Sequence, residues 1–169
     1  MIMKTNVIAF LTMTLLISTS CQKKIDILKE QEAIKSVMEE EKNSFFNKDP
    51  ERMAATWIQK PSSIKLYMMN TGQIQLIGWD KIYESDKKYM ETDTLDRKNM
   101  KIIFSDYQFN IYENNAWVFF KATWNVPYND SIVAFEQTRI SAFEKSDGKW
   151  KYKLMAIYNI PPKEETVSK

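Results

Sequence analysis

The sequence predicts an α+β domain in which three helices pack on an antiparallel sheet. Three observations predict this class: apolar residues at helical spacing early in the chain, alternating apolar and polar residues later, and short turns between the later segments. The predicted order is helix, helix, strand, strand, helix and then four strands, with no repeat and no linker. Helices that are segregated from one antiparallel sheet define the α+β class.

The first two helices are predicted from periodicity and capping. Residues 26–48 carry apolar residues near helical spacing, and the acidic run 39–41 between them is interpreted as the solvated face of this helix. Asp49 and Pro50 are typical of an N-cap and a first helical turn, so a second short helix is expected through Trp57. The apolar positions of the first helix are Ile27, Ile34, Val37, Met38, Phe45 and Phe46.

Strands dominate the remainder of the chain. Two short strands, at 63–69 and 73–77, flank a turn that contains Gly72, and a third helix is predicted over 79–91. Four longer strands follow, at 101–112, 116–126, 132–145 and 149–160. Because hairpin-like turns join them, they are expected to pair antiparallel. Residues 161–169 are predicted to form a disordered polar tail.

The composition excludes several classes of function. The 169 residues include no histidine, three glycines and one cysteine. Catalytic triads and zinc sites that use histidine are therefore impossible. The glycines are too far apart for the two glycine-rich loops that bind phosphate, G-x-G-x-x-G and G-x-x-x-x-G-K-[ST]. A formal net charge of +2 does not indicate a nucleic-acid partner, and the sequence predicts no metal and no cofactor. Hydrophobic residues at 44% and charged residues at 27% are ordinary for one globular domain.

The N-terminus carries an export signal. One Lys precedes an uncharged run at 7–17, which is too short to span a bilayer as a helix, and three small residues then precede Cys21. This layout resembles a bacterial lipobox, with Ser18 where Leu is usual. The resemblance implies removal of residues 1–20, acylation of Cys21 and a tether at 21–25. The alternative is ordinary cleavage after Ser20, which releases a soluble exported protein.

The lipoprotein resemblance also implies a cellular location. The protein is expected in the bacterial cell envelope, with the membrane as a partner through lipidated Cys21. Gln22 stands where many lipoproteins of the inner membrane carry Asp, so the resemblance favours the outer membrane.

The mature chain resembles the nuclear transport factor 2-like family, also called SnoaL-like. The motifs that carry the resemblance are GWDKI at 78–82, EQTR at 136–139 and DGKW at 147–150, and it extends over 27–159. The last two motifs are similar to the association domain of calcium/calmodulin-dependent protein kinase. The resemblance implies a cystatin-like cone at 26–160, in which a strongly curved sheet wraps the first helix and any ligand enters at the mouth.

The last hairpin decides which side chains face the inside of this cone. A two-residue turn at 147–148 places Arg139 opposite Ala156 and Gln137 opposite Tyr158. Arg139 and Gln137 then share the inner face with residues of the last strand.

The alternative register moves the pairing by one residue. A bulge at Gly148 would turn Thr138 and Glu136 inward instead. We favour the two-residue turn, because Lys149, Lys151 and Lys153 mark the opposite face of the last strand as solvent-exposed.

An arginine inside an apolar cone needs a partner, because an unpaired buried charge is costly. Internal pairing of Arg139 with a carboxylate such as Asp106 or Glu136 is the expected solution, and an anionic ligand is the alternative. The predicted ligand-binding residues are Arg139, Gln137, Tyr158, Trp124, Trp57 and Tyr83.

These observations favour a binding protein over an enzyme, without excluding catalysis. The expected ligand is a small, partly apolar molecule, either neutral or anionic, or else a protein partner that binds at the outer face of the sheet. Relatives such as ketosteroid isomerase use carboxylates in the cone, so the runner-up is an isomerase or dehydratase that uses Asp106 or Glu136. A third possibility is a structural module without a pocket.

One predicted strand is apolar on both faces at its start. Trp117 and Phe119 point to one face, and Val118 and Phe120 point to the other. A strand that is covered on both faces predicts a homodimer through the sheet.

Overall fold

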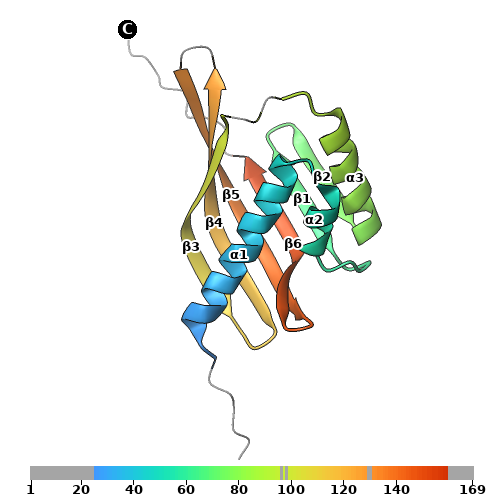
Figure 1. Ribbon diagram of the computed structural model, residues 1–169, viewed down its shortest axis with the longest axis vertical. Coiled ribbons are helices and arrows are strands. Elements are labelled where there is room, and N and C mark those ends of the chain that lie inside the picture. The colour runs from blue at the N-terminus through green and yellow to red at the C-terminus, as the bar shows by residue number, and fades with distance from the viewer. Residues whose placement is uncertain (1–24, 96, 98, 129–130, 160–169) are drawn as a thin grey trace, which may run out of the picture.

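A curled sheet with helices across its inner face forms the domain (Figure 1). The computed structural model describes residues 25–95, 97, 99–128 and 131–159. The predicted signal peptide, the predicted acylation site Cys21 and the predicted tail lie outside the described residues. The element order is the predicted one, so the α+β class with three helices is confirmed.

The helices begin where the capping residues predict. In α1 (Ile27–Phe46), the Asp26 side chain accepts a hydrogen bond from the Lys29 amide at 3.1 Å. In α2 (Pro50–Ala55), Asp49 accepts from the Arg52 amide at 3.0 Å. The third helix, α3 (Trp79–Thr92), follows Gly78, whose φ of 94° favours glycine.

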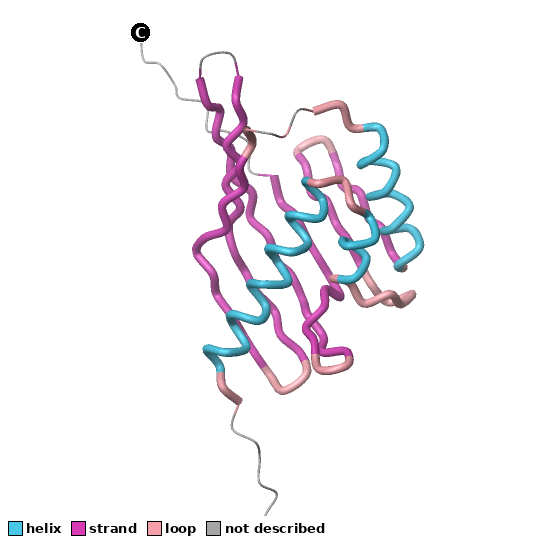
Figure 2. Tube along the Cα trace, viewed as in Figure 1, coloured by secondary structure: helices cyan, strands magenta, loops and turns pink. Residues whose placement is uncertain are grey.

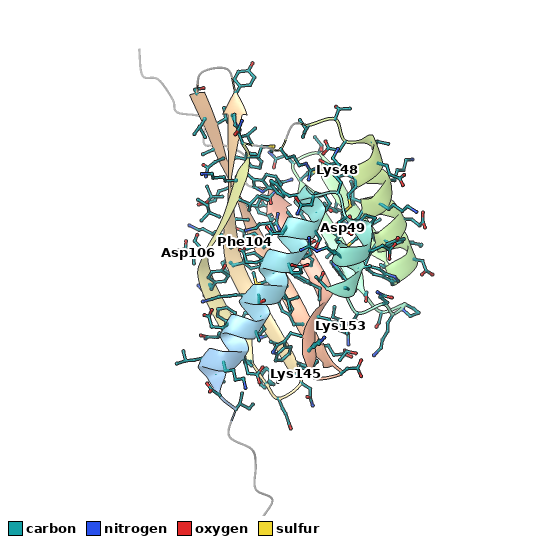
Figure 3. The ribbon with its side chains drawn as sticks, viewed as in Figure 1. Lys48, Asp49, Phe104, Asp106, Lys145 and Lys153 are labelled. Atoms are coloured by element: carbon teal, nitrogen blue, oxygen red, sulfur yellow. The ribbon has the colours of Figure 1, made fainter. Side chains whose placement is uncertain are left out.

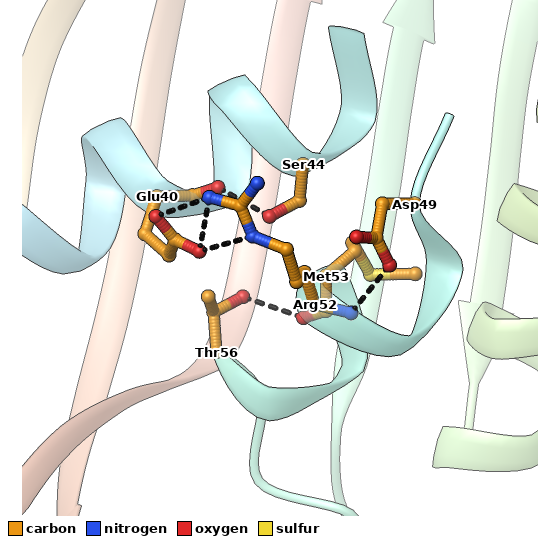
Figure 4. A network of polar contacts seen from close by, with 6 residues as sticks. All are labelled: Glu40, Ser44, Asp49, Arg52, Met53 and Thr56. Carbon is orange, nitrogen blue, oxygen red and sulfur yellow. Dashed lines mark hydrogen bonds and ion pairs between the residues drawn. The ribbon is translucent and has the colours of Figure 1, made fainter. Parts of the chain in front are cut away.

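An exposed ion pair joins α2 to α1. The Arg52 guanidinium donates to both carboxylate oxygens of Glu40, at 2.9 and 3.0 Å (Figure 4). In the same region the Ser44 hydroxyl donates to the Glu40 carbonyl oxygen at 2.6 Å. The Arg52–Glu40 pair orients the short helix against the long one, although exposed pairs stabilise a fold by less than about 1 kcal/mol.

Six strands pair in the order β2-β1-β6-β5-β4-β3. Most pairs are antiparallel, but β1 and β6 run parallel, because the chain reaches β6 through the rest of the sheet and not through a hairpin. The long hairpin of β4 and β5 projects beyond the other strands (Figure 2). The strands are β1 (Ile64–Met69), β2 (Gly72–Ile77), β3 (Lys101–Ile111), β4 (Asn115–Tyr128), β5 (Ser131–Ser146) and β6 (Lys149–Asn159).

The last hairpin starts in the favoured register and then changes it. Ser146 pairs with Lys149, as a two-residue turn requires, but the register shifts between Ala142 and Phe143. Arg139 consequently lies opposite Ile157 and not Ala156. Gln137, which was expected opposite Tyr158, pairs instead with Asn159. A bulge adds one residue to a strand, so every later side chain of β6 changes face.

The hydrophobic core lies between α1 and the inner face of the sheet. Odd-numbered positions of β5 and even-numbered positions of β4 face inward, as the alternating pattern predicts. Fully buried side chains of this core include Ile34, Met38, Trp57, Val118, Phe120, Phe143 and Tyr152.

Candidate functional site

A large pocket lies between the second half of α1, α3 and the inner face of the sheet. Its volume is about 990 Å³, and most of its lining is apolar. Volumes up to about 1,000 Å³ are typical of small-molecule sites. Apolar side chains that line it include Phe45, Phe46, Tyr67, Ile74, Met155 and Ile157.

Arg139 is the cation on the sheet side of the pocket. Its side chain projects from β5, and the residue is only 6% exposed. Nε and Nη2 donate to the Gln137 Oε1 atom at 3.2 and 2.7 Å, and the guanidinium lies 5.6 Å from the Phe104 ring centroid. Among the described residues, no carboxylate lies within ion-pair distance of Arg139. Burial lowers the pKa of this guanidinium, which still remains charged at neutral pH.

Gln137 holds the guanidinium in place. Its Oε1 atom also accepts from Trp124 Nε1 at 2.9 Å, and its Nε2 atom donates to Asn159 Oδ1 at 2.7 Å. The amide group therefore has partners on both sides and fixes the Arg139 side chain in one orientation.

Glu41 brings a carboxyl group to the same pocket from α1. The residue is 5% exposed and makes no ion pair within the described part of the chain. Burial raises the pKa of the Glu41 carboxyl, while the charges of Lys65 and Arg139 act in the opposite direction.

A buried ion pair completes the polar lining. Lys65 Nζ on β1 lies 2.7 Å from Asp86 Oδ2 on α3, and both residues are about 2% exposed. The ammonium also lies within 6 Å of the ring centroids of Phe45, Trp57 and Tyr67. Burial by itself lowers the pKa of Lys65, but Asp86, Tyr67 and Glu41 together outweigh this effect, so the pKa lies above its ordinary value.

Three aromatic rings form one wall of the pocket. Trp124 stacks on Phe46 from α1 at 5.9 Å and on Phe135 from β5 at 5.6 Å between centroids. All three residues line the pocket. Such a wall suits a flat apolar ligand.

Three of the six predicted ligand-binding residues do not line the pocket. Trp57 is fully buried and stacks on Tyr152 at 5.3 Å, so it belongs to the core. Tyr83 on α3 is half-buried against the core and donates to Glu51 Oε1 on α2 at 2.6 Å. Tyr158 is 45% exposed on the outer face, because the shift in β6 turned it outward. The other three, Arg139, Gln137 and Trp124, come together in the pocket.

Asp106 and Glu136 also lie outside the pocket. Both approach Lys121 on the outer face, at 3.1 and 3.7 Å, and neither pairs with Arg139. Figure 3 shows Asp106 at the outer edge of β3, where a φ of 54° accompanies the register shift after Ser105. The expected internal pairing of Arg139 with one of these carboxylates is therefore wrong.

Sequence reasoning missed three polar residues of the pocket: Glu41, Lys65 and Asp86. The interpretation of residues 39–41 as a solvated face is wrong for Glu41. A signal for it exists, since Glu41 continues the buried stripe of Ile34 and Met38 at helical spacing. Asp86 likewise follows Ile82 by one turn.

A second hollow of about 680 Å³ adjoins the pocket beside the end of α1. Lys48 and Arg97 line it, and both bind groups at the helix ends: Arg97 donates to the Phe45 carbonyl oxygen at 3.2 Å and pairs with the Asp93 carboxylate, and Lys48 donates to the Asp93 carbonyl oxygen. These cations satisfy the last carbonyl groups of two helices, which is a structural role.

Within the described ranges, no three His, Cys, Asp or Glu side chains lie close enough together to hold a metal ion. No described helix is both long and apolar enough to cross a bilayer.

Comparison with known proteins shows the fold. No protein-family model and no curated protein matches the chain. Solved structures do match: a cystatin-like protein of unknown function from Nostoc punctiforme shares 14% identity, with a TM-score of 0.63 over 79% of this chain and 93% of its own. A protein from Novosphingobium aromaticivorans, provisionally named a scytalone dehydratase, shares 18%, with a TM-score of 0.64 over 79% and 86%.

A third match carries the family name. A Streptomyces avermitilis protein, provisionally a dehydratase of the nuclear transport factor 2-like family, shares 12% identity, with a TM-score of 0.61 over 78% of this chain and 97% of its own. The domain thus has the cystatin-like, nuclear transport factor 2-like cone fold that the motifs predicted.

Proposed function

We propose that this domain binds a small, partly apolar anion in the pocket between α1 and the sheet. The observation that carries the proposal is the buried Arg139 guanidinium, which faces the pocket without a carboxylate partner among the described residues. A buried unpaired charge is costly, and an anionic ligand would supply the missing partner.

The lining supports an amphiphilic ligand. One end of the pocket offers the fixed guanidinium of Arg139, and the wall of Phe46, Trp124 and Phe135 offers apolar contact. A few polar groups in a mostly apolar pocket are typical of sites that orient one small molecule. The ligand is therefore an organic anion with an apolar body and not a small inorganic ion.

Arg139→Gln is expected to weaken binding of 8-anilino-1-naphthalenesulfonate about 10- to 150-fold, because a hydrogen bond to a charged group contributes about 1.5–3 kcal/mol. N-phenyl-1-naphthylamine, which lacks the sulfonate, should bind both proteins equally. Fluorescence titration measures both affinities. Lys121→Gln removes a cation from the outer face and serves as the control. An equal loss for both probes, or none for the sulfonate, would refute the proposal.

Proton-transfer catalysis is a second candidate, and Glu41 favours it. Its carboxyl lines the pocket, has a raised pKa and makes no ion pair among described residues. Two of the similar structures bear provisional dehydratase names. The test is a panel of aromatic hydroxy acids, followed by mass spectrometry for loss of water. Turnover by the wild type that Glu41→Gln abolishes would establish an enzyme.

We further propose that acylated Cys21 anchors the protein in the envelope, favouring the outer membrane. The tether at 21–25 reaches about 15 Å, which keeps the domain close to the bilayer. The 20 residues of α1 span about 30 Å, so Phe45 and Phe46 at the pocket lie at the end far from the anchor. A ligand would then enter from the aqueous side.

Cys21→Ser is expected to move the protein from the membrane fraction to the soluble fraction. The serine variant cannot be acylated, and the described domain contributes no spanning helix. Fractionation followed by mass spectrometry of the N-terminal peptide measures the change. Retention of the serine variant in membranes would contradict lipidation.

A homodimer through the outer face of the sheet is the third part of the proposal. Trp117, Ile140 and Tyr158 expose more than 40% of their surface on three adjacent strands of that face. Exposed apolar patches of this kind mark interaction surfaces.

Trp117→Glu should convert the dimer to a monomer, because each copy would bury an unpaired carboxylate in the interface. Analytical ultracentrifugation measures the mass. Lys149→Glu, at the exposed tip of the last hairpin, is the matched control and should remain dimeric. A dimer that persists in the Trp117 variant places the interface elsewhere.

A further inference from the structure

We infer that Glu41 couples ligand binding to proton uptake: an anion binds at Arg139 together with one proton, which Glu41 takes from solvent. The inference rests on the proposed anion site. It adds Glu41 as a residue whose protonation state sets the net charge of the pocket and so the charge of the ligand that the pocket accepts. It is carried by the arrangement of four buried charged groups around one pocket.

The charges of the pocket come from four different elements. Lys65 and Asp86 neutralise each other at 2.7 Å. Glu41 and Arg139 remain, one from α1 and one from β5, and both are at least 94% buried. The two charges attract each other through space, but the two groups are not in ion-pair contact. The pocket is therefore neutral when Glu41 is ionised, and it carries one positive charge when Glu41 is protonated.

No other described group that faces Glu41 can take up the proton. Burial raises the pKa of the Tyr67 and Tyr152 hydroxyls. Both hydroxyls are therefore already protonated at pH 7 and cannot accept a further proton. Lys42 on the same helix pairs with the exposed Glu39. Asp86 is held by the Lys65 ammonium.

An anion that binds at Arg139 changes the pKa of the Glu41 carboxyl. Before binding, burial raises the pKa of Glu41, while the charges of Lys65 and, less strongly, Arg139 favour the ionised carboxylate. A bound anion cancels the attraction from Arg139 and adds repulsion, so the pKa of Glu41 rises on binding. Binding then takes up a proton at every pH between the free and the bound pKa, and affinity falls as pH increases through this window.

The number of unpaired cations in the pocket also limits the charge of the ligand. One unpaired cation accepts one negative charge, while a second would require another cation in a buried site. The structure thus favours monoanions, such as carboxylates or sulfonates, over phosphate dianions.

The experiment uses 8-anilino-1-naphthalenesulfonate, whose sulfonate stays ionised across the pH range. Calorimetric titration in two buffers of different ionisation enthalpy gives the number of protons taken up per bound ligand. The wild type should take up close to one proton within the window, and its affinity should fall about tenfold per pH unit there. N-phenyl-1-naphthylamine should take up none.

Two variants of α1 provide the comparison. Glu41→Gln should bind the sulfonate with no proton uptake and with an affinity that does not change with pH. Glu39→Gln removes an exposed carboxylate of the same helix and should behave as the wild type. Infrared difference spectra of the wild type give a readout without mutation, since ligand addition should increase the carboxylic acid C=O band.

The two hypotheses fail in different ways. Sulfonate binding that depends on Arg139 but takes up no proton, or proton uptake that persists in Glu41→Gln, overturns the role of Glu41 alone. Sulfonate binding that does not depend on Arg139 overturns the anion site itself.

Discussion

Asp86→Asn is expected to destabilise the protein by about 3–5 kcal/mol, because it leaves the Lys65 ammonium buried without its carboxylate. The two groups lie 2.7 Å apart, and their side chains are 2% and 3% exposed. The cation–π contacts of Lys65 with three rings do not replace a full negative charge. Urea unfolding followed by tryptophan fluorescence measures the loss.

The pH dependence of this variant follows from the same argument. Asp86 supplies the largest of the effects that raise the pKa of Lys65, so without it burial is expected to outweigh the remaining charges, such as Glu41, and to lower that pKa below its unfolded value. The unfolded chain then binds more protons, so the stability of the variant should increase with pH. The deficit relative to the wild type should accordingly shrink as pH rises towards the ordinary pKa of lysine.

Two controls separate the buried pair from a general effect of charge removal. Glu40→Gln breaks the exposed pair with Arg52 and should cost less than about 1 kcal/mol (Figure 4). Replacing both Lys65 and Asp86, by Met and Leu, should recover most of the lost stability. An Asp86→Asn loss no larger than that of Glu40→Gln would contradict the burial of the pair.

Trp57→Ala should lower stability by about 3–5 kcal/mol, because it removes a fully buried ring from the centre of the core. The ring packs between Tyr152, at 5.3 Å, and Trp79, at 6.4 Å between centroids. Urea unfolding again gives the magnitude. This result would confirm that Trp57 supports the fold and does not contact the ligand.

Trp57→Phe tests the ligand side of the same prediction. The phenyl ring retains most of the buried apolar surface, so this variant should fold and should bind the naphthalenesulfonate with unchanged affinity. A stable Trp57→Ala protein with lost binding would instead restore the predicted ligand-binding role of Trp57.

The buried charges relate stability to function in this pocket. Lys65 and Asp86 compensate each other and hold β1 to α3, whereas the described residues that contact Arg139 directly are all neutral. The Lys65–Asp86 pair is neutral without a ligand, while the Arg139 guanidinium remains available to bind an anionic ligand. The two variants Asp86→Asn and Arg139→Gln should therefore affect different properties, stability in one case and ligand affinity in the other.

The sequence alone determined the secondary structure and the fold class, because their signals are local. The capping residues Asp26 and Asp49, the alternation along the strands and the turn at 147–148 each act within a few residues. Arg139 and Gln137 were predicted to face inward for the same reason, since strand alternation near a tight turn is short-range information.

Only the tertiary structure decided the composition of the pocket. Its charged groups, Glu41, Lys65, Asp86 and Arg139, come from four elements, and their mutual distances depend on how helices and strands pack. A single bulge in β6 turned Tyr158 outward, although the local pattern placed it inside. Glu41 looked solvated within an acidic run, but a helix buries one side of such a run when it packs against a sheet. Local patterns specify the elements, whereas the long-range packing of those elements specifies which charges meet.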